Sequence, residues 1–144
     1  MGDVLETRFE LRASPREVWD VLTDFEAYPS WNPYVRAVAG ELDEGASITL
    51  LVTPPDVDEF TVGLKVGKVE QARSIELFHE SSSLDIALRR AVIEVEPTDE
   101  GTSVLVFRRE MELGDRPGPV LGDRGEVALE MLATALEARV RQLR

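Results

Sequence analysis

The sequence predicts a domain of the α+β class, in which one strand and one or two short helices precede about six antiparallel strands and a long C-terminal helix. Three observations support this order. A helix-start motif follows a strand pattern near the N-terminus, period-two segments fill residues 35–113, and residues 122–144 have helical periodicity. The length of 144 residues suits a single domain over 1–144, which is enough to bury about two-thirds of its unfolded surface.

Residues 4–12 predict the first strand, since one face of the alternating pattern holds Leu5, Thr7, Phe9 and Leu11. A helix start follows at once. Ser14 can cap, Pro15 suits the first helical position and Glu17 completes a capping box. The apolar stripe of this helix is Val18, Val21, Leu22 and Phe25, with Trp19 beside it. Prolines at positions 29 and 33 predict that any helix within 25–34 is short and broken.

The middle of the chain predicts an antiparallel meander, because β-rich segments alternate with short turns. These segments are 47–53, 60–66, 74–79, 86–96 and 102–113. Gly63 and Gly67 interrupt the clearest period of two and predict a bend or bulge in a long strand. The Gly/Pro-rich stretch 114–119 then predicts a hinge loop before the last helix.

The last helix, 122–144, carries an apolar stripe formed by Leu129, Leu132, Leu136, Val140 and Leu143. Its charged side includes Glu130 and Glu137. The side facing away from those charges is centred near Ala128, Leu132, Ala135 and Arg139. Two alanines on that side predict open space between the helix and the sheet.

Composition excludes several classes of function. A net charge of −12 gives the wrong field for binding nucleic acid or anionic membranes. No cysteine and a single histidine predict no metal and no thiolate chemistry. Acidic groups such as Asp43/Glu44 and Asp99/Glu100 fall in predicted turns and indicate solvated loops. Without a signal peptide or an apolar run of about 20 residues, the expected location is the cytoplasm.

The segment 14–34, and above all Trp31-Asn32-Pro33, resembles the opening signature of the START-like (SRPBCC) superfamily. Val95-Glu96-Pro97 followed by Gly101-Thr102-Ser103 is similar to the family's penultimate hairpin. The resemblance covers essentially the whole chain. It implies a helix-grip fold, in which a curved antiparallel sheet of about seven strands wraps around the C-terminal helix and encloses an apolar cavity. It also implies a small hydrophobic or amphipathic ligand and no cofactor.

Two polar residues are candidates for catalysis or for anchoring a ligand. His79 shares a strand face with Ile75 and Leu77, although a histidine wetted or hydrogen-bonded at a strand end explains it equally simply. Arg109 shares a face with Phe107 and needs a partner there, either a ligand carboxylate or an internal acid, unless it reaches water. Several family members keep a histidine near the position of Ala91, where this chain has none.

The expected ligand-binding set combines these residues with the apolar positions that face the predicted cavity. It comprises Trp31, Tyr34, Leu64, Leu77, His79, Ala91, Phe107, Arg109, Ala128, Leu132 and Ala135. Trp31 can line the cavity mouth or plug the end of the sheet, and Asn32 is expected to cap a turn. We expect the cavity entrance at 114–118 and 28–34.

Two functions follow from this reading. The first is a carrier or sensor that binds a lipid-like, polyketide-like or aromatic molecule. The second is a cofactor-independent cyclase or dehydratase, which requires polar groups that converge on the substrate. His79, Arg109 and Tyr34 are the candidates for those groups, so the sequence favours binding. A basic protein partner would suit the acidic loops, but an acidic surface also serves solubility.

Overall fold

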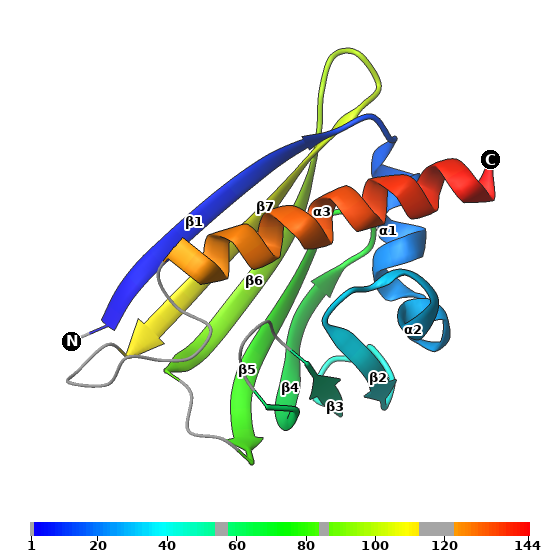
Figure 1. Ribbon diagram of the computed structural model, residues 1–144. Helices are drawn as coiled ribbons and strands as arrows, with labels where there is room; N and C mark the ends of the chain where they lie inside the picture. Colours follow the sequence, from blue (N-terminus) through cyan, green and yellow to red (C-terminus); the bar gives the residue numbers. More distant parts are fainter. Residues whose placement is uncertain (1, 54–57, 84–86, 113–122) are drawn as a thin grey trace.

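The computed structural model describes residues 2–53, 58–83, 87–112 and 123–144 (Figure 1). The first strand, β1 (Gly2–Leu11), leads into helix α1 (Pro15–Thr23), the 3₁₀ turn η1 (Phe25–Ala27) and the short helix α2 (Tyr28–Trp31). The remaining elements are β2 (Val35–Ala39), β3 (Ser47–Val52), β4 (Phe60–Glu70), β5 (Ser74–Ser82), β6 (Leu88–Pro97), β7 (Ser103–Glu112) and α3 (Asp123–Leu143).

The strands within these ranges form one sheet in the order β1-β7-β6-β5-β4-β3-β2, and every neighbouring pair is antiparallel. Strands β1 and β2 therefore lie at opposite edges, and α1, η1 and α2 connect them. Figure 1 shows α3 lying across the concave side of the curved sheet. The predicted α+β class and the helix-grip arrangement are confirmed.

The N-terminal elements form as their sequence predicts. In β1 the face that includes Phe9 and Leu11 is turned inward, while Glu6, Arg8 and Glu10 are exposed. The capping box is present, since the Glu17 backbone N–H donates to Ser14 Oγ (3.2 Å) and the Ser14 N–H donates to Glu17 Oε1 (3.0 Å). The broken segment before β2 contains only η1 and α2.

Both glycines of β4 coincide with irregular pairing to β5. The register shifts between Gly63 and Leu64 and again between Val66 and Val69, which confirms the predicted bulges. A Cβ atom at Gly67 would lie 2.7 Å from Phe78 Cε2, so a larger residue would require the side chains of Glu76 and Phe78 to shift. Pairing of Gly63 with Ser81 and of Val62 with Ser82 continues β5 to Ser82, beyond the predicted segment 74–79.

The core fills the space between the concave face of the sheet and the helices. Its fully buried side chains come from α1, from the central strands and from α3, and they include Val18, Val66, Leu105 and Leu136. The sheet therefore has one apolar face and one polar face, which is the usual division in an antiparallel sheet covered on one side.

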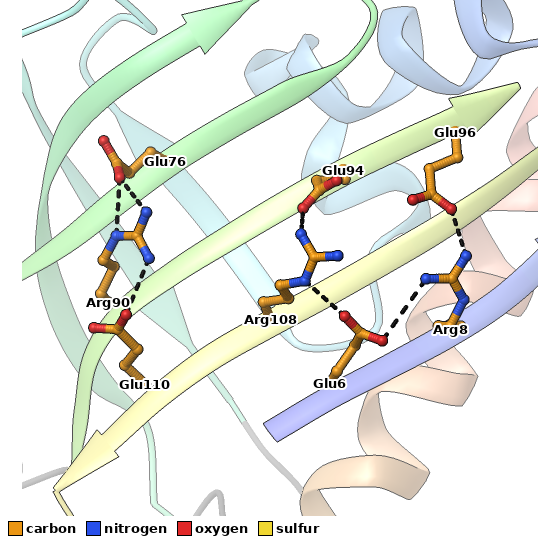
Figure 2. A network of polar contacts seen from close by, with 8 residues as sticks. All are labelled: Glu6, Arg8, Glu76, Arg90, Glu94, Glu96, Arg108 and Glu110. Carbon is orange, nitrogen blue, oxygen red and sulfur yellow. Dashed lines mark hydrogen bonds and ion pairs between the residues drawn. The ribbon is translucent and has the colours of Figure 1, made fainter. Parts of the chain in front are cut away.

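The polar face carries a network of glutamates and arginines over β1, β7, β6 and β5 (Figure 2). Each arginine in it bridges two carboxylates, of which at least one is on another strand. Arg8 pairs with Glu6 and Glu96, Arg108 with Glu6 and Glu94, and Arg90 with Glu76 and Glu110. A hydrogen bond from Arg108 lowers the pKa of Glu6, and one from Arg90 lowers the pKa of Glu76. Exposed pairs of this kind each add at most about 1 kcal/mol.

The C-terminal end of α3 is fixed to the start of α1 and the end of β1. Arg144 donates from Nε to Glu17 Oε2 (2.8 Å) and from Nη2 to the Arg12 carbonyl oxygen (3.0 Å). The Arg12 backbone N–H donates to Glu137 Oε2 (2.8 Å). The Arg144 hydrogen bond, together with that from Ser14, lowers the pKa of Glu17 to about 2.

This junction predicts a pH-dependent contribution to stability. Because the folded-state pKa of Glu17 lies below its ordinary value of 4.5, its carboxylate stabilises the fold above pH 4.5, and the contribution is lost as the pH falls towards 2. Glu17→Gln keeps a capping acceptor but removes the charge. We expect it to lower the free energy of unfolding by about 0.5–1 kcal/mol at neutral pH. In urea titrations the difference from wild type should shrink below pH 4.5, whereas a constant difference would contradict this role.

Candidate ligand-binding cavity

An apolar, partly open cavity of about 160 Å³ lies between α3 and the concave face of the sheet. Its floor comes from β3, β5, β6 and β7, its roof from α3, and its end wall from the segment between α1 and β2. The lining residues are Leu22, Phe25, Tyr28, Trp31, Asn32, Val35, Leu42, Ile48, Leu50, Ile75, Leu77, Ile93, Phe107, Leu132 and Leu136. No charged side chain is among these described lining residues, so the arrangement suits an apolar guest.

Three aromatic rings form the end wall of the cavity. Phe25 and Tyr28 meet edge to face with centroids 5.6 Å apart, and Tyr28 and Trp31 do so at 5.1 Å. The spacing of three residues places these rings on one side of consecutive tight turns. Such edge-to-face contacts add roughly 0.5–1.5 kcal/mol each beyond burial, so the wall is a fixed surface.

The polar atoms of the end wall are mostly occupied by the chain itself. The Tyr28 hydroxyl donates to the Leu22 carbonyl oxygen, and burial raises the pKa of Tyr28, with a smaller effect of Asp24. Asn32 Oδ1 accepts from the backbone N–H groups of Tyr34 and Val35, both at 2.9 Å. Asn32 therefore shapes the turn into β2, as its sequence position predicts.

Trp31 differs from its neighbours in the wall. Its Nε1 is buried and has no hydrogen-bond partner. A buried indole N–H usually finds an acceptor, because leaving one unpaired costs about 1–3 kcal/mol.

The structure brings four of the sequence-predicted site residues together at the cavity: Trp31, Leu77, Phe107 and Leu132. The other seven lie outside its lining. Leu64 is buried in the core, while Ala91, Ala128 and Ala135 are half-buried. Tyr34 is half-buried on the chain after α2, and its hydroxyl donates to Met131 Sδ at 3.0 Å.

The two polar candidates also lie outside the lining. His79 Nε2 is 3.1 Å from Ser82 Oγ near the end of β5. A serine and a histidine at this distance can share a proton, but the described contacts place no carboxylate behind the ring to orient it. Arg109, half-buried on β7, donates from Nη2 to Thr7 Oγ1 at 2.9 Å, so part of its predicted need for a partner is met inside the fold.

The rotation of α3 differs from the sequence prediction. Its buried positions are Ala133, Leu136 and Val140, whereas Ala128 and Ala135 stay partly exposed. The prediction assumed that Glu137 faces solvent. Instead its carboxylate accepts a hydrogen bond from the Arg12 backbone N–H, and Ala133, not Ala128 or Ala135, is the buried alanine of α3.

Several lining residues were missed from the sequence. Ile75 and Ile93 are direct partners across β5 and β6, and Ile75 shares the strand phase that identified Leu77. Phe25, Tyr28 and Trp31 recur at intervals of three, which is the pattern that could have identified the wall.

Of the expected entrance, 114–118 lies outside the described residues. The remainder, 28–34, includes Tyr34 and its contact with α3.

The described residues contain neither a cluster suited to a metal ion nor a helix suited to spanning a membrane. Within them, no three side chains of the His, Cys, Asp or Glu type are grouped so that they could hold a metal ion. No helix in the described ranges has the length and apolar character required to span a membrane.

Comparison with known proteins identifies the family. Residues 3–144 match the family described as polyketide cyclase / dehydrase and lipid transport, and the chain belongs to it. Solved structures with the same fold include a START superfamily protein from Mycobacterium smegmatis, with 23% identity, a TM-score of 0.77, and 98% of this chain and 99% of that chain covered. A search of curated proteins gives no match.

Two enzymes are among the similar structures. The Zhui aromatase/cyclase from Streptomyces has 19% identity and a TM-score of 0.72, with 100% of this chain and 97% of that chain covered. Norcoclaurine synthase from Thalictrum flavum has 17% identity and a TM-score of 0.72, with coverages of 97% and 94%. At these identities the likeness shows the fold.

The end wall predicts a local stability effect. Asn32→Ala leaves the N–H groups of Tyr34 and Val35 without their acceptor, so we expect the free energy of unfolding to fall by about 1–3 kcal/mol. Ser30→Ala, on the exposed side of α2, should change it by less than about 0.5 kcal/mol. Equal effects of the two substitutions in chemical denaturation would show that Asn32 does not hold this turn.

Proposed function

We propose that this protein binds one small hydrophobic or amphipathic molecule in the cavity beneath α3, as a carrier or sensor. The observation that carries the proposal is an apolar, partly open space of about 160 Å³ beneath α3. At about 24 cal/mol per Å³, an empty space of this size corresponds to roughly 4 kcal/mol of lost packing. A ligand that fills it recovers contacts that the chain itself does not make.

The size of the cavity limits the ligand. An engineered cavity of about 150 Å³ in another protein holds benzene, whereas pockets for drug-sized molecules measure about 300–1,000 Å³. With 160 Å³ available, the cavity fits a single-ring molecule or a short acyl chain. A longer lipid or polyketide would require α3 or the end wall to move.

The alternative is an enzyme of the cyclase or dehydratase type. The family description and the enzymes with the same fold support it. Tyr28 is the one titratable side chain among the described lining residues, and its hydroxyl already donates to Leu22. His79 and Arg109 lie outside the lining, so binding without chemistry accords better with the cavity. Recovery of a bound ligand unchanged after prolonged incubation would support the carrier, and its conversion would support the enzyme.

The proposal also includes the kind of partner and the cellular location. The partner is a small molecule; nucleic acid and membrane insertion are not part of it, because the net charge of −12 repels phosphate groups. We place the protein in the cytoplasm, and a protein partner is not needed, because the described lining of the cavity comes from this chain alone.

Filling the cavity tests the proposal. Leu132 lies in the roof and is only half-buried, so Leu132→Trp has room to turn its ring into the cavity. We expect fluorobenzene to bind the wild type, seen by ¹⁹F NMR, and to bind Leu132→Trp at least about tenfold more weakly.

The matched control is Val127→Trp on the same helix, where the side chain is 54% exposed. It should bind fluorobenzene like the wild type. Circular dichroism establishes that each variant is folded. Unchanged binding in folded Leu132→Trp would place the probe outside this cavity and refute the proposal.

A further inference from the structure

We propose that the free edge of β1 is a docking surface for an extended, lysine- or arginine-rich segment of another protein, which adds to the sheet as a further strand. The proposal concerns the outside of the molecule and does not depend on the ligand cavity. It starts from the place of β1 at the end of the sheet, where, within the described residues, it pairs with β7 alone.

The backbone groups of β1 point alternately to β7 and to the free edge, as in any antiparallel pair. The Glu112 N–H donates to the carbonyl oxygen of Ala87, the residue before β6, so even-numbered residues of β7 face β6 and odd-numbered ones face β1. Their partners on β1 are also odd-numbered. The N–H and C=O groups of even-numbered β1 residues, such as Arg8, therefore point to the free edge. In agreement, the next N–H of this series, that of Arg12, donates to Glu137 of α3.

The edge formed by β1 lacks most of the features that normally block a sheet edge. Edge strands are often short, bulged, covered or interrupted by proline, because an open row of backbone groups recruits other strands. The opposite edge strand, β2, has five residues and a register shift, and it contacts η1 and α2. Strand β1 has ten residues, no proline and a continuous register with β7. Of the two edges, β1 is therefore the better template.

A groove of about 390 Å³ beside β1 leaves room for the added strand. Residues 8–11 line it from β1, and α3, which crosses the sheet next to this edge in Figure 1, lines it from the other side. The α3 side presents the small side chains of Ala133 and Thr134 between Glu130 and Glu137. A strand about 4.8 Å from β1 would direct alternate side chains towards these residues.

The charges around the groove favour a basic segment. Glu10 and Glu130 are exposed and form no ion pair within the described residues. Glu137 lies on the same wall as Glu130, about two helical turns away. The one cation of the described lining, Arg8, already pairs with Glu96. Lysine or arginine side chains of an added strand would meet carboxylates, whereas a second copy of this chain would bring a further net charge of −12.

The first test compares two capped peptides of equal length and charge, one of alternating lysine and valine and one of alternating lysine and proline. Proline cannot donate to a ladder and does not form a paired strand. In calorimetry at physiological salt, we expect the lysine–valine peptide to bind the wild type at least about tenfold more tightly, because it gains backbone hydrogen bonds. Equal binding of the two peptides would show attraction by charge alone and would overturn the proposal.

Arg8→Pro and Arg8→Ala separate the backbone from the charge. Both substitutions remove a cation that repels the peptide, but only proline removes the N–H at the free edge, where it leaves the bonds to β7 intact. We expect Arg8→Ala to bind the lysine–valine peptide at least as tightly as the wild type, and Arg8→Pro to bind it about tenfold more weakly than Arg8→Ala. Equal binding by the two variants, with folding verified by circular dichroism, would refute strand addition.

A third pair of variants tests the wall of the groove. Glu130→Gln should weaken binding of the lysine–valine peptide by roughly twofold to fivefold, the range of one exposed ion pair. Glu59→Gln is the matched control, because Glu59 is exposed and precedes β4, which β5, β6 and β7 separate from β1. Equal effects of the two substitutions would show that the peptide responds to the overall charge and not to this groove, and would contradict the proposal.

Hydrogen exchange on the wild type needs no variant. The peptide should slow exchange of the Glu6, Arg8 and Glu10 amides, which face the free edge, and change little at Thr7 and Phe9, which pair with β7. Protection that does not alternate in this way would overturn the proposal. Sedimentation should show a monomer without peptide, whereas a dimer with these same amides protected would place a second copy on the edge and refute a basic partner.

Discussion

The rotation of α3 about its own axis determines which side chains form the roof of the cavity. The concave face of the sheet is apolar and must be covered, and α3 is the element that covers it. Its buried side chains Ala133, Leu136 and Val140 face the core. Glu137 and Arg144 attach its C-terminal end to the Arg12 backbone and to Glu17. With the helix held there, Leu132 and Leu136 become the roof, and the small side chains Ala128 and Ala135 lie at its flank.

The cavity remains because the elements around it cannot approach more closely. The strands of a curved sheet diverge from a straight helix, and the end wall places three large rings where the sheet opens. The turn held by Asn32 sets the depth of that wall. Away from the cavity, Leu105 and Val106 are at 0% exposure, so the core is not loose throughout.

Local sequence patterns were sufficient to predict the fold and part of the cavity lining. The alternation in β5 and β7 identified Leu77 and Phe107, and the motif at Ser14 located the start of α1. The rotation of α3 was not accessible in this way, because the sequence does not show that Glu137 accepts a hydrogen bond from a backbone group 125 positions away. A charged residue on a helix normally indicates a solvent face, and here that rule failed.

The network on the outer face of the sheet responds unequally to the loss of its members. Three arginines are shared among five glutamates, so each guanidinium separates carboxylates that would otherwise lie close together across the strands (Figure 2). Loss of a glutamate relieves an excess of negative charge, whereas loss of Arg108 removes the cation that Glu6 and Glu94 share and leaves Glu6 with Arg8 at 3.7 Å. In a chain with a net charge of −12, the few basic side chains are therefore the least replaceable part of the surface.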